Sequence, residues 1–384
     1  MKGMGESLRD HHSLQICKED KVKVPIINVL PPNGGNGTYS YSKNSYFQRI
    51  SSNVVKSNIE EEIYKKLDVK KLASTSNIIR VVDLGCATGP NTFMTIQNLL
   101  ESMKHKYQNQ CPNTPTKIPE FHVFFNDQLS NDFNTLFTTL PQDIQYFVAG
   151  VPGSFHGRLF PESSLHFAFS SYAIHFLSKS PQELQQKNSP TWNKGRVHYT
   201  SASKEVVDAY AAQFAKDVRD FLDARAKELV PGGMLVMVLQ GIPNGLHHSD
   251  TVNGLMYDYM GSILMEIAKE GMFDESKVDS FNLPYYGPNP EEMAKLVKTN
   301  GRFNIERMEL TNPAPWLKSI RQIIPEWTVH VRAAMEGTFI RQFGNEVTHE
   351  MFQRLIKQLT QNIEMLETKL WDMTQLFVVL KRKE

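Results

Sequence analysis

Two acidic residues and a glycine turn are the part of this sequence whose residue types and spacing best suit ligand chemistry. Asp83 follows a largely apolar run at residues 78–82 and leads into a turn at 85–89, while Asp127 follows a second run at 121–126. Glycines after a buried strand let the backbone approach a ligand at the carboxyl end of that strand. An acid at the tip of the second strand typically binds ribose hydroxyls in nucleotide-binding α/β folds. The pattern therefore indicates a site for an adenosine-containing compound.

The spacing of the glycines discriminates among such compounds. The turn has the pattern Gly85-x-x-x-Gly89, and the β-carbons between the glycines hinder the close approach that a pyrophosphate requires. A ligand without phosphates, such as S-adenosylmethionine, fits better than NAD. Asp127 also lies further from Asp83 than the ~20 residues of the dinucleotide pattern, because a polar loop near 107–119 intervenes. The alternative is a βα turn whose glycines serve only the fold.

The composition is that of a large soluble chain. Of 384 residues 40% are hydrophobic, and 42 Lys and Arg against 41 Asp and Glu leave a formal net charge of +1. This balance gives no electrostatic argument for a nucleic-acid or membrane partner. No apolar run approaches the ~18 residues of a membrane span and no signal peptide is visible, so we expect a cytoplasmic protein. The three cysteines, Cys17, Cys86 and Cys111, suggest no disulfide framework.

The apolar runs also predict the elements that position both acids. We expect strands at residues 78–83, 121–127, 146–151, 165–170, 234–239, 303–310 and 376–380. Helical patterns alternate with the first five, including a long helix near Lys204–Leu229. This alternation predicts an α/β fold with a mostly parallel, seven-stranded sheet that is covered on both faces. Two acids at the ends of successive strands are a more specific signal than either alone.

The chain beyond the fifth strand contains more helix than connections between strands require. The stretches 251–271, 290–300 and 347–366 are mainly helical, with proline-rich breaks at 284–290 and 312–315. We interpret this part as a helical cap over the strand tips.

The N-terminal region divides into a leader and a polar segment. Residues 1–32 are expected to form a flexible leader, and a glycine-rich loop follows at 33–37. Residues 39–48 are dense in hydroxyl, amide and aromatic side chains. They can close a lid over a small ligand, or they can be the capped start of an amphipathic helix.

Several motifs occur in an order that is typical of one plant enzyme family. They are DLGCATGPNT (83–92), FFND (124–127), GVPGSFHGRLFP (150–161), SSYAIHFLS (170–178), WNKG (192–195) and DSFNLP (279–284). With them the sequence resembles, over roughly residues 33–384, the SABATH methyltransferases, which include salicylate, jasmonate and farnesoate carboxyl methyltransferases and caffeine synthases. The resemblance implies a Rossmann-like S-adenosylmethionine-dependent methyltransferase domain with an α-helical cap, commonly as a homodimer. The core would comprise about 50–250, 301–311 and 373–384, and the cap about 251–300 and 312–372.

The resemblance also assigns binding residues by position. The expected cofactor site consists of Tyr41, Ser45, Asp83, Cys86, Asn91, Asp127, Gln128, Ser154, Phe155 and Ser171. The expected acceptor pocket consists of Gln48, Tyr172, His175, Phe176, Met256, Tyr257, Val331 and Met373. A position at which some relatives bind Mg²⁺ is matched by Asn193, Asp279, Phe281 (through its carbonyl) and Asn282. All-oxygen ligands suit that ion, and a loop-fixing hydrogen-bond cluster is the alternative.

Within the cofactor site each role has a chemical reason. Asp127 suits the ribose diol, and Phe155 can stack on the adenine. Asp83 should meet the ammonium group of the methionine part.

Two positions depart from the salicylate-methylating relatives. Asn33 replaces a lysine, as it does in xanthine-methylating relatives, and Phe176 replaces a tryptophan whose indole N–H grips the acceptor carboxylate. Phenylalanine has no hydrogen-bond donor. We therefore expect an acceptor bulkier than salicylate, held by Gln48 with His175 or Tyr172.

The expected reaction is methylation of a small plant carboxylic acid to its methyl ester. A carboxylate is already ionised at pH 7, so alignment suffices and we name no acid–base residue. The alternative is an N-methyltransferase acting on a xanthine-like heterocycle, for which His175 would become a candidate base. A nicotinamide-dependent oxidoreductase is disfavoured by the glycine spacing, and a catalytically silent acid-binding relative stays open.

Overall fold

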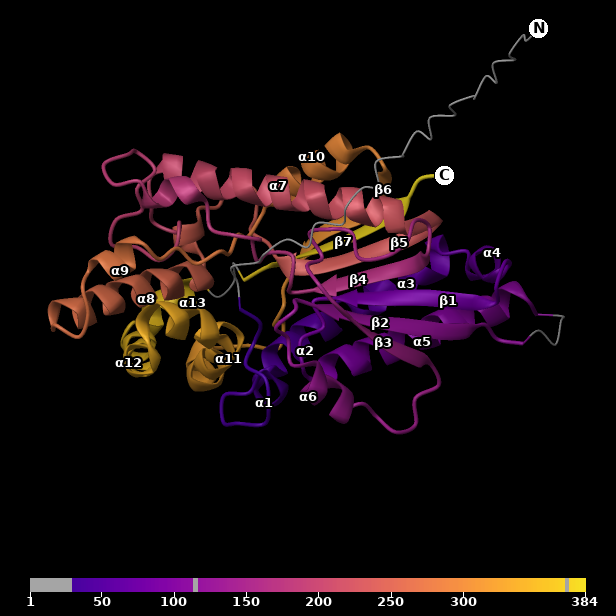
Figure 1. Ribbon diagram of the computed structural model, residues 1–384, viewed down its shortest axis with the longest axis horizontal. Coiled ribbons are helices and arrows are strands. Elements are labelled where there is room, and N and C mark those ends of the chain that lie inside the picture. The colour runs from indigo at the N-terminus through magenta and orange to yellow at the C-terminus, as the bar shows by residue number, and fades with distance from the viewer. Residues whose placement is uncertain (1–29, 113–116, 370–372) are drawn as a thin grey trace, which may run out of the picture.

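A seven-stranded sheet forms the centre of the molecule, with the strand order β3-β2-β1-β4-β5-β7-β6 (Figure 1). The structure is a computed structural model and describes residues 30–112, 117–369 and 373–384. The strands are β1 Ile78–Leu84, β2 Glu120–Asp127, β3 Phe147–Pro152, β4 Leu165–Ser171, β5 Leu229–Gln240, β6 Phe303–Thr311 and β7 Gln375–Arg382. All seven predicted strands are confirmed. Most of the predicted leader, with Cys17, lies outside the described residues.

Strand direction divides the sheet into two parts. β3, β2, β1, β4 and β5 are mutually parallel, whereas β7 runs antiparallel to both β5 and β6. The mostly parallel sheet is therefore confirmed. β1 lies between β2 and β4, so the strand order reverses there, and open α/β sheets bind ligands outside the carboxyl ends of the strands at such a point. Asp83 is the residue of β1 that pairs with Phe125 of β2 and Phe169 of β4 at this edge.

Helices cover both faces of the sheet (Figure 1). One face carries α7 (Lys204–Glu228) and α10 (Pro290–Asn300). The other carries α3 (Lys56–Lys66), α4 (Val69–Ala73) and α5 (Pro90–Gln110). Because both faces are covered, β4 and β7 are buried along most of their length, and β7 contains the continuous apolar run 376–380.

The placement of α10 differs from the cap that the sequence predicts. Met293 and Val297 of this helix are buried in the same apolar cluster as the inner side of α7, and α10 packs on α7 and β6. Residues 290–300 therefore cover the sheet, because their apolar side chains face it.

A second group of helices packs beyond the sheet and has a hydrophobic core of its own. It consists of α8 (Val252–Lys269), α9 (Ser276–Asp279), α11 (Ile324–Phe343), α12 (Asn345–Gln361) and α13 (Ile363–Thr368). These elements confirm the predicted helical cap. Short 3₁₀ helices also occur, at Gln182–Gln185, His248–Asp250 and Ile320–Gln322.

The cap helix α11 is absent from the elements predicted from the sequence. Val331, Arg332 and Ala333 are three consecutive buried residues of this helix, because α1, α2 and α12 pack around it. A helix that is buried all round lacks the one-sided apolar stripe by which helices are recognised in a sequence.

The segment before α2 (Tyr46–Val54) joins the cap to the sheet. Asn33 N donates to Ala333 O of α11 at 2.8 Å. Gly35 N donates to Asp132 Oδ2, at the start of α6 (Phe133–Thr138), also at 2.8 Å. With the short helix α1 (Tyr41–Asn44), this segment packs against α11.

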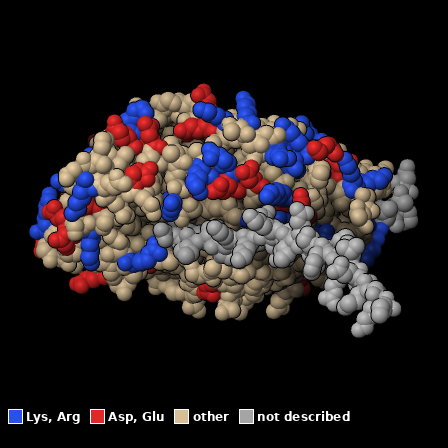
Figure 2. Space-filling view, turned by 45° about the horizontal axis from the view of Figure 1, so that its top comes forward, with Lys and Arg blue, Asp and Glu red and all other residues tan. Residues whose placement is uncertain are grey.

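The surface in Figure 2 shows basic and acidic side chains interspersed over one face of the molecule. This distribution agrees with a formal net charge of +1. Within the described residues, no helix is long and apolar enough to cross a membrane.

Candidate active site

The turn after β1 is shaped so that a ligand can reach its backbone. Gly85 has a φ of +87°, and a Cβ at this position would lie 2.3 Å from the Cβ of Ala173, so only glycine fits. The amide nitrogens of Gly85 and Cys86 both donate to Asn126 O, at 2.8 and 3.0 Å. The turn is thereby attached to the end of β2, next to Asp127.

Asp127 is a buried carboxylate at the tip of β2. Its Oδ2 accepts a hydrogen bond from Ala87 N and its Oδ1 one from Gln128 N, both at 2.8 Å. Burial raises the pKa of Asp127 to about 6, although the two backbone hydrogen bonds act in the opposite direction.

Asp83 is a second buried carboxylate near the first. Thr92 Oγ1 of α5 donates to Asp83 Oδ2. Burial raises the pKa of Asp83 to about 7, and the charge of Asp127 adds to this increase. Neither carboxylate takes part in an ion pair within the described part of the chain. A cationic ligand would supply the opposite charge and favour ionisation of both.

Two adjoining cavities lie at this edge of the sheet. The larger, of about 230 Å³, is lined by five of the predicted cofactor residues, Tyr41, Asp127, Gln128, Ser154 and Phe155. The smaller is lined by Tyr41 again and by Asp83, Cys86, Asn91 and Ser171. Ser45 lines neither, but Asn91 Nδ2 donates to both its carbonyl and its hydroxyl oxygen at 3.0 Å. The structure thus brings together cofactor residues that lie far apart in the sequence.

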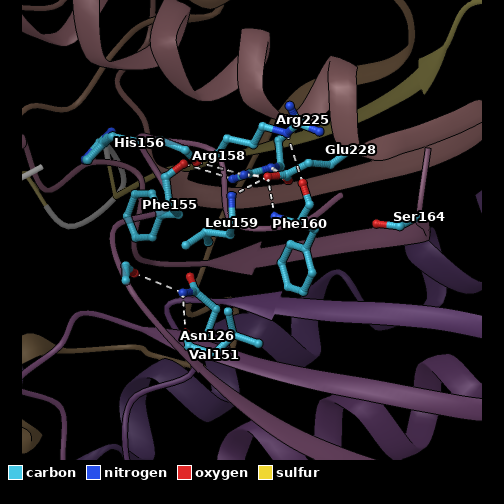
Figure 3. Close-up of polar contacts among 12 residues, drawn as sticks. Asn126, Val151, Phe155, His156, Arg158, Leu159, Phe160, Ser164, Arg225 and Glu228 are labelled. Carbon is cyan, nitrogen blue, oxygen red and sulfur yellow. Dashed lines mark hydrogen bonds and ion pairs between the residues drawn. The ribbon is translucent and has the colours of Figure 1, made fainter. Parts of the chain in front are cut away.

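The loop after β3 carries Ser154 and Phe155 to the larger cavity. Figure 3 shows the ring of Phe155 on this loop. The ring of Phe155 packs perpendicular to Phe221 of α7, with centroids 6.0 Å apart and an interplanar angle of 87°. An aromatic ring that is held by a neighbouring ring and borders a cavity suits stacking on a planar base.

The predicted acceptor residues all line the larger cavity, together with residues that the sequence analysis missed. The predicted ones are Gln48, Tyr172, His175, Phe176, Met256, Tyr257, Val331 and Met373. The missed ones include Gln240, Tyr285, Trp316, Ile320, Ile323, Trp327 and Met335. Gln240 directly follows the strand predicted at 234–239, and a polar residue at the end of a strand was a usable signal. The residues from α11 and the segment before it had none, because α11 itself was not recognised.

His175 is a neutral hydrogen-bonding group. Its Nδ1 accepts from Gln240 N at 3.1 Å, which leaves the proton on Nε2. The ring is buried against those of Tyr285 and Phe176, with centroids 4.5 and 5.0 Å away. Burial lowers the pKa of His175 to about 3. A ring whose Nδ1 already accepts a hydrogen bond and whose pKa is lowered by burial is a weak base near pH 7, so these observations disfavour His175 as a base.

Gln48 and Tyr172 present different groups to the cavity. Gln48 Nε2 donates to Ser171 O at 3.3 Å, which leaves its second N–H for a ligand. Tyr172 donates its hydroxyl proton to Gln375 Oε1. The proton of Tyr172 is therefore used within the protein, and its oxygen also hydrogen-bonds with Ser51, so Tyr172 offers no donor to a ligand.

The residues predicted to bind Mg²⁺ cluster where two segments, 193–195 and 279–282, are joined by hydrogen bonds. Asn193 Nδ2 donates to Asn282 Oδ1, and Gly195 N donates to Asp279 Oδ1, both at 2.8 Å. Phe281 is buried in the core of the cap. Asn193 Oδ1 is buried without a hydrogen-bond partner in the described residues. Those residues contain no group of three or more His, Cys, Asp or Glu that could hold a metal ion.

The fold and the site together define the class of protein. A sheet that reverses its strand order at a glycine turn, beside two buried carboxylates, is the arrangement of a Rossmann-like S-adenosylmethionine-dependent methyltransferase. A family model described as SAM dependent carboxyl methyltransferase matches residues 27–383. The chain therefore belongs to the SABATH family of carboxyl methyltransferases, as the motifs predict.

Individual relatives agree with this assignment. The chain is 42% identical to loganic acid O-methyltransferase of Catharanthus roseus over 371 residues, which cover 95% of this chain and 98% of that protein. It is 40% identical to farnesoic acid carboxyl-O-methyltransferase of Arabidopsis thaliana over 350 residues (91% and 97%). Caffeine synthase 3 of Camellia sinensis is 33% identical over 374 residues (93% and 97%).

A solved structure extends the agreement to the fold. The structure of loganic acid methyltransferase with SAH matches with a TM-score of 0.86 and 41% sequence identity, and covers 92% of this chain and 99% of that chain. The predicted fold, dependence on S-adenosylmethionine and carboxyl methyltransferase activity are thus confirmed.

Proposed function

We propose that the protein forms the methyl ester of a plant carboxylic acid that is bulkier than salicylate and largely apolar. The observation that carries this proposal is the apolar wall of the cavity, to which Trp316, Ile320, Trp327 and Met335 contribute. The cavity beside this wall can hold a hydrophobic group. The wall itself offers few hydrogen-bonding groups to hydroxyls of a substrate. Two of the relatives, named for loganic acid and farnesoic acid, support an acceptor larger than salicylate.

The cofactor is proposed to span both cavities. Asp127 would bind the ribose diol through its free lone pairs, and Phe155 would stack on the adenine. The methionine part would reach the smaller cavity, where Asp83 lies near its ammonium group. Asp127 and Asp83 line these cavities and have raised pKa values. A cationic ligand would stabilise their charged forms, which supports this placement.

The acceptor carboxylate is proposed to bind between Gln48 and His175. Gln48 keeps one N–H for the acceptor, and the Nε2 N–H of His175, whose ring borders the cavity, would supply the second donor in place of the ring's hydrogen bond with the Tyr172 backbone. Phe176 adds an apolar surface and is held perpendicular to Tyr285, with centroids 5.3 Å apart. A carboxylate held by two donors keeps the oxygen that attacks the methyl group in a defined position.

The chemistry follows from this arrangement. S-adenosylmethionine supplies a methyl group on a sulfonium, and a carboxylate oxygen displaces the sulfur to give the methyl ester and S-adenosylhomocysteine, without proton transfer. Gln48 and His175 hold the acceptor in line, and the cap excludes water. Alignment of this kind contributes up to about 7–11 kcal/mol in favourable intramolecular reactions.

Methylation of a nitrogen heterocycle has less support. Asn33, the residue shared with xanthine-methylating relatives, donates to Glu336 Oε2 at 2.6 Å and to Tyr39 O at 3.1 Å, and it does not line the cavity. It thus stabilises the N-terminal segment instead of contacting an acceptor. His175, the candidate base for a nitrogen acceptor, is held neutral with Nδ1 in use.

A screen with isotopically labelled S-adenosylmethionine tests the proposal. Farnesoic acid, loganic acid, salicylic acid and a xanthine are offered separately, and the products are identified by mass spectrometry. We expect a methyl ester from an apolar bulky acid and little product from salicylic acid. An N-methylated xanthine as the main product would overturn the proposal.

A Mg²⁺ ion at the Asn193 cluster stays a prediction. The unpartnered Asn193 Oδ1 and the carboxylate of Asp279 are oxygen ligands that suit Mg²⁺, whereas Asn282 Oδ1 is already used by Asn193. A bound ion would tie the two loops together and take no part in the reaction. Calorimetric titration with MgCl₂ of the wild type and of Asn193→Ala tests it, because heat that persists in the variant excludes this site.

The partners and location also stay predictions. We expect a homodimer, as the family resemblance implies, in the cytoplasm and without nucleic-acid or membrane partners, and the formal net charge of +1 supports only the last of these expectations. Size-exclusion chromatography with light scattering measures the oligomeric state directly.

A further inference from the structure

A buried ion pair lies at the end of α7, outside the cavity. Arg225 and Glu228 are one helical turn apart, both side chains have zero exposure, and Arg225 Nη2 lies 2.6 Å from Glu228 Oε2. Desolvation makes such a pair a weak source of stability, and its replacement by apolar residues is often neutral or favourable. The best-supported role of a buried pair is to specify one arrangement of the chain around it.

The remaining polar groups of the pair are used by one loop (Figure 3). Arg225 donates from Nη1 to Phe155 O at 2.9 Å and from Nη2 to Gly157 O at 3.1 Å. Glu228 Oε1 accepts from Leu159 N at 2.5 Å and from Phe160 N at 3.0 Å. Every one of these contacts is to the backbone of residues 155–160, so they set the path of the loop.

The start of the same loop is fixed from the opposite side. Asn126 Nδ2 donates to Val151 O at 2.7 Å and to Gly153 O at 2.9 Å. The carbonyl oxygen of Asn126 accepts from the glycine turn after β1. The loop is therefore held between the glycine turn and α7, with Phe155 between the two anchors.

The position of the Phe155 ring follows from these anchors. Its carbonyl is held by Arg225, and its ring packs perpendicular to Phe221, which lies one turn before Arg225 on α7. The guanidinium of Arg225 lies over the Phe221 ring, 5.2 Å from its centroid. One end of α7 thus holds both the backbone and the ring of Phe155.

We propose that Arg225 and Glu228 are positioning residues for the cofactor, which hold residues 155–160 so that Phe155 presents its ring to the adenine. Residues 157–161, the second half of the GVPGSFHGRLFP motif, do not line the cavity. The proposed role gives these residues a function, because their backbone is what the ion pair holds. The inference rests on the proposed placement of the adenine on Phe155.

The first experiment measures the dissociation constant of S-adenosylhomocysteine by calorimetry. Arg225→Met combined with Glu228→Leu removes the pair without leaving a buried charge, and urea unfolding reports its stability. We expect a folded protein whose affinity falls by about tenfold or more, the loss typical of a displaced base-stacking ring. Arg225→Lys, which keeps the opposite charges but not the planar fork, should also weaken binding.

The matched control is the pair Lys216 and Asp220 on the exposed side of the same helix, with a separation of 2.9 Å. Lys216→Met with Asp220→Leu should leave the affinity for S-adenosylhomocysteine unchanged. Wild-type affinity in either folded Arg225 variant would overturn the positioning role.

Phe155→Ala tests the premise that the adenine stacks on Phe155 separately from the positioning role of Arg225 and Glu228. Alone, it should weaken S-adenosylhomocysteine binding, and if it does not, the adenine does not lie on Phe155. Combined with the Arg225→Met and Glu228→Leu changes, it should reduce their effect on affinity, because the ring that they position is gone. Full additivity would show that the pair does not act through Phe155.

Discussion

Gln240 and Gln375 lie opposite each other at the cavity end of the antiparallel strands β5 and β7, and each accepts a hydrogen bond from a cavity-lining tyrosine. Gln240 Oε1 accepts from Tyr285 Oη, and Gln375 Oε1 accepts from Tyr172 Oη. Gln375 also donates from Nε2 to Ser51 O of α2, the helix that carries Gln48, at 3.0 Å. The glutamine pair therefore accepts the hydroxyl protons of both tyrosines.

Replacing Gln375 should disturb catalysis through Tyr172. In Gln375→Leu the buried hydroxyl of Tyr172 loses its acceptor, which costs about 1–3 kcal/mol in stability. Turnover should fall more than the affinity for S-adenosylhomocysteine, measured by urea unfolding, steady-state kinetics and calorimetry. The control is Tyr172→Phe combined with Gln375→Leu, which removes both partners and should recover much of the stability. A double variant that is less stable than Gln375→Leu would contradict this reasoning.

Asp127→Ala should weaken the binding of S-adenosylhomocysteine by roughly 1.5–3 kcal/mol, the range for hydrogen bonds to a charged group. The reason is that Asp127 offers its remaining lone pairs to the ribose while Ala87 N and Gln128 N orient it. Calorimetry gives the affinity, and circular dichroism checks that the variant is folded. Unchanged affinity in a folded variant would remove Asp127 from the ribose site.

Cofactor binding should depend on pH through the two buried acids. The pKa of Asp83 is raised from 3.8 to about 7, and that of Asp127 from 3.8 to about 6. Between about pH 4 and 7 the free folded protein therefore binds more protons than the unfolded chain. Its stability should therefore fall as pH rises from about 4 to 7. Cationic S-adenosylmethionine favours the ionised acids, so its stabilising effect on the melting temperature should grow over the same window.

Asp83→Asn provides the control for this pH dependence. The variant cannot ionise at position 83, so the increase in stabilisation between pH 6 and 7 should shrink. An equal increase in the variant and the wild type would show that Asp83 is not the titrating group.

At saturating S-adenosylmethionine, where the pH dependence of cofactor binding no longer enters, the rate of methyl transfer should show no rise near pH 6.5. The pKa of His175 is lowered to about 3, so its protonation state is constant across the neutral range. His175→Ala should lower kcat/KM by an equivalent of about 1–3 kcal/mol, because a charge-assisted hydrogen bond to the acceptor is lost. A pH-dependent rise in the wild type that disappears in His175→Ala would instead indicate proton removal from a nitrogen acceptor.

Phe176→Trp should shift the acceptor range toward smaller acids. The indole supplies an N–H donor and fills space beside Tyr285, whose ring already contacts Phe176. Activity on bulky apolar acids should fall, and activity on salicylic acid should appear or rise, as measured with labelled S-adenosylmethionine. Increased activity on the bulky acid would show that Phe176 does not limit the pocket.

The sequence by itself determined the elements and residues whose signals are local. The strands that end in Asp83 and Asp127 are apolar runs, and the turn between β1 and α5 is marked by its glycines. These features depend on a few neighbouring residues, so they can be recognised without knowing what packs against them. The family motifs then supplied the list of cofactor and acceptor residues.

Tertiary structure alone decided which distant residues meet. Residues 327–340 of helix α11 include no exposed residue and lack a one-sided apolar pattern, so the apolar wall to which Trp327 and Met335 contribute could not be predicted. The contact of Arg225 with Phe155 O and that of Gln375 with Tyr172 join segments far apart in the chain. Because such contacts depend on how whole helices and strands pack, no local pattern in the sequence records them.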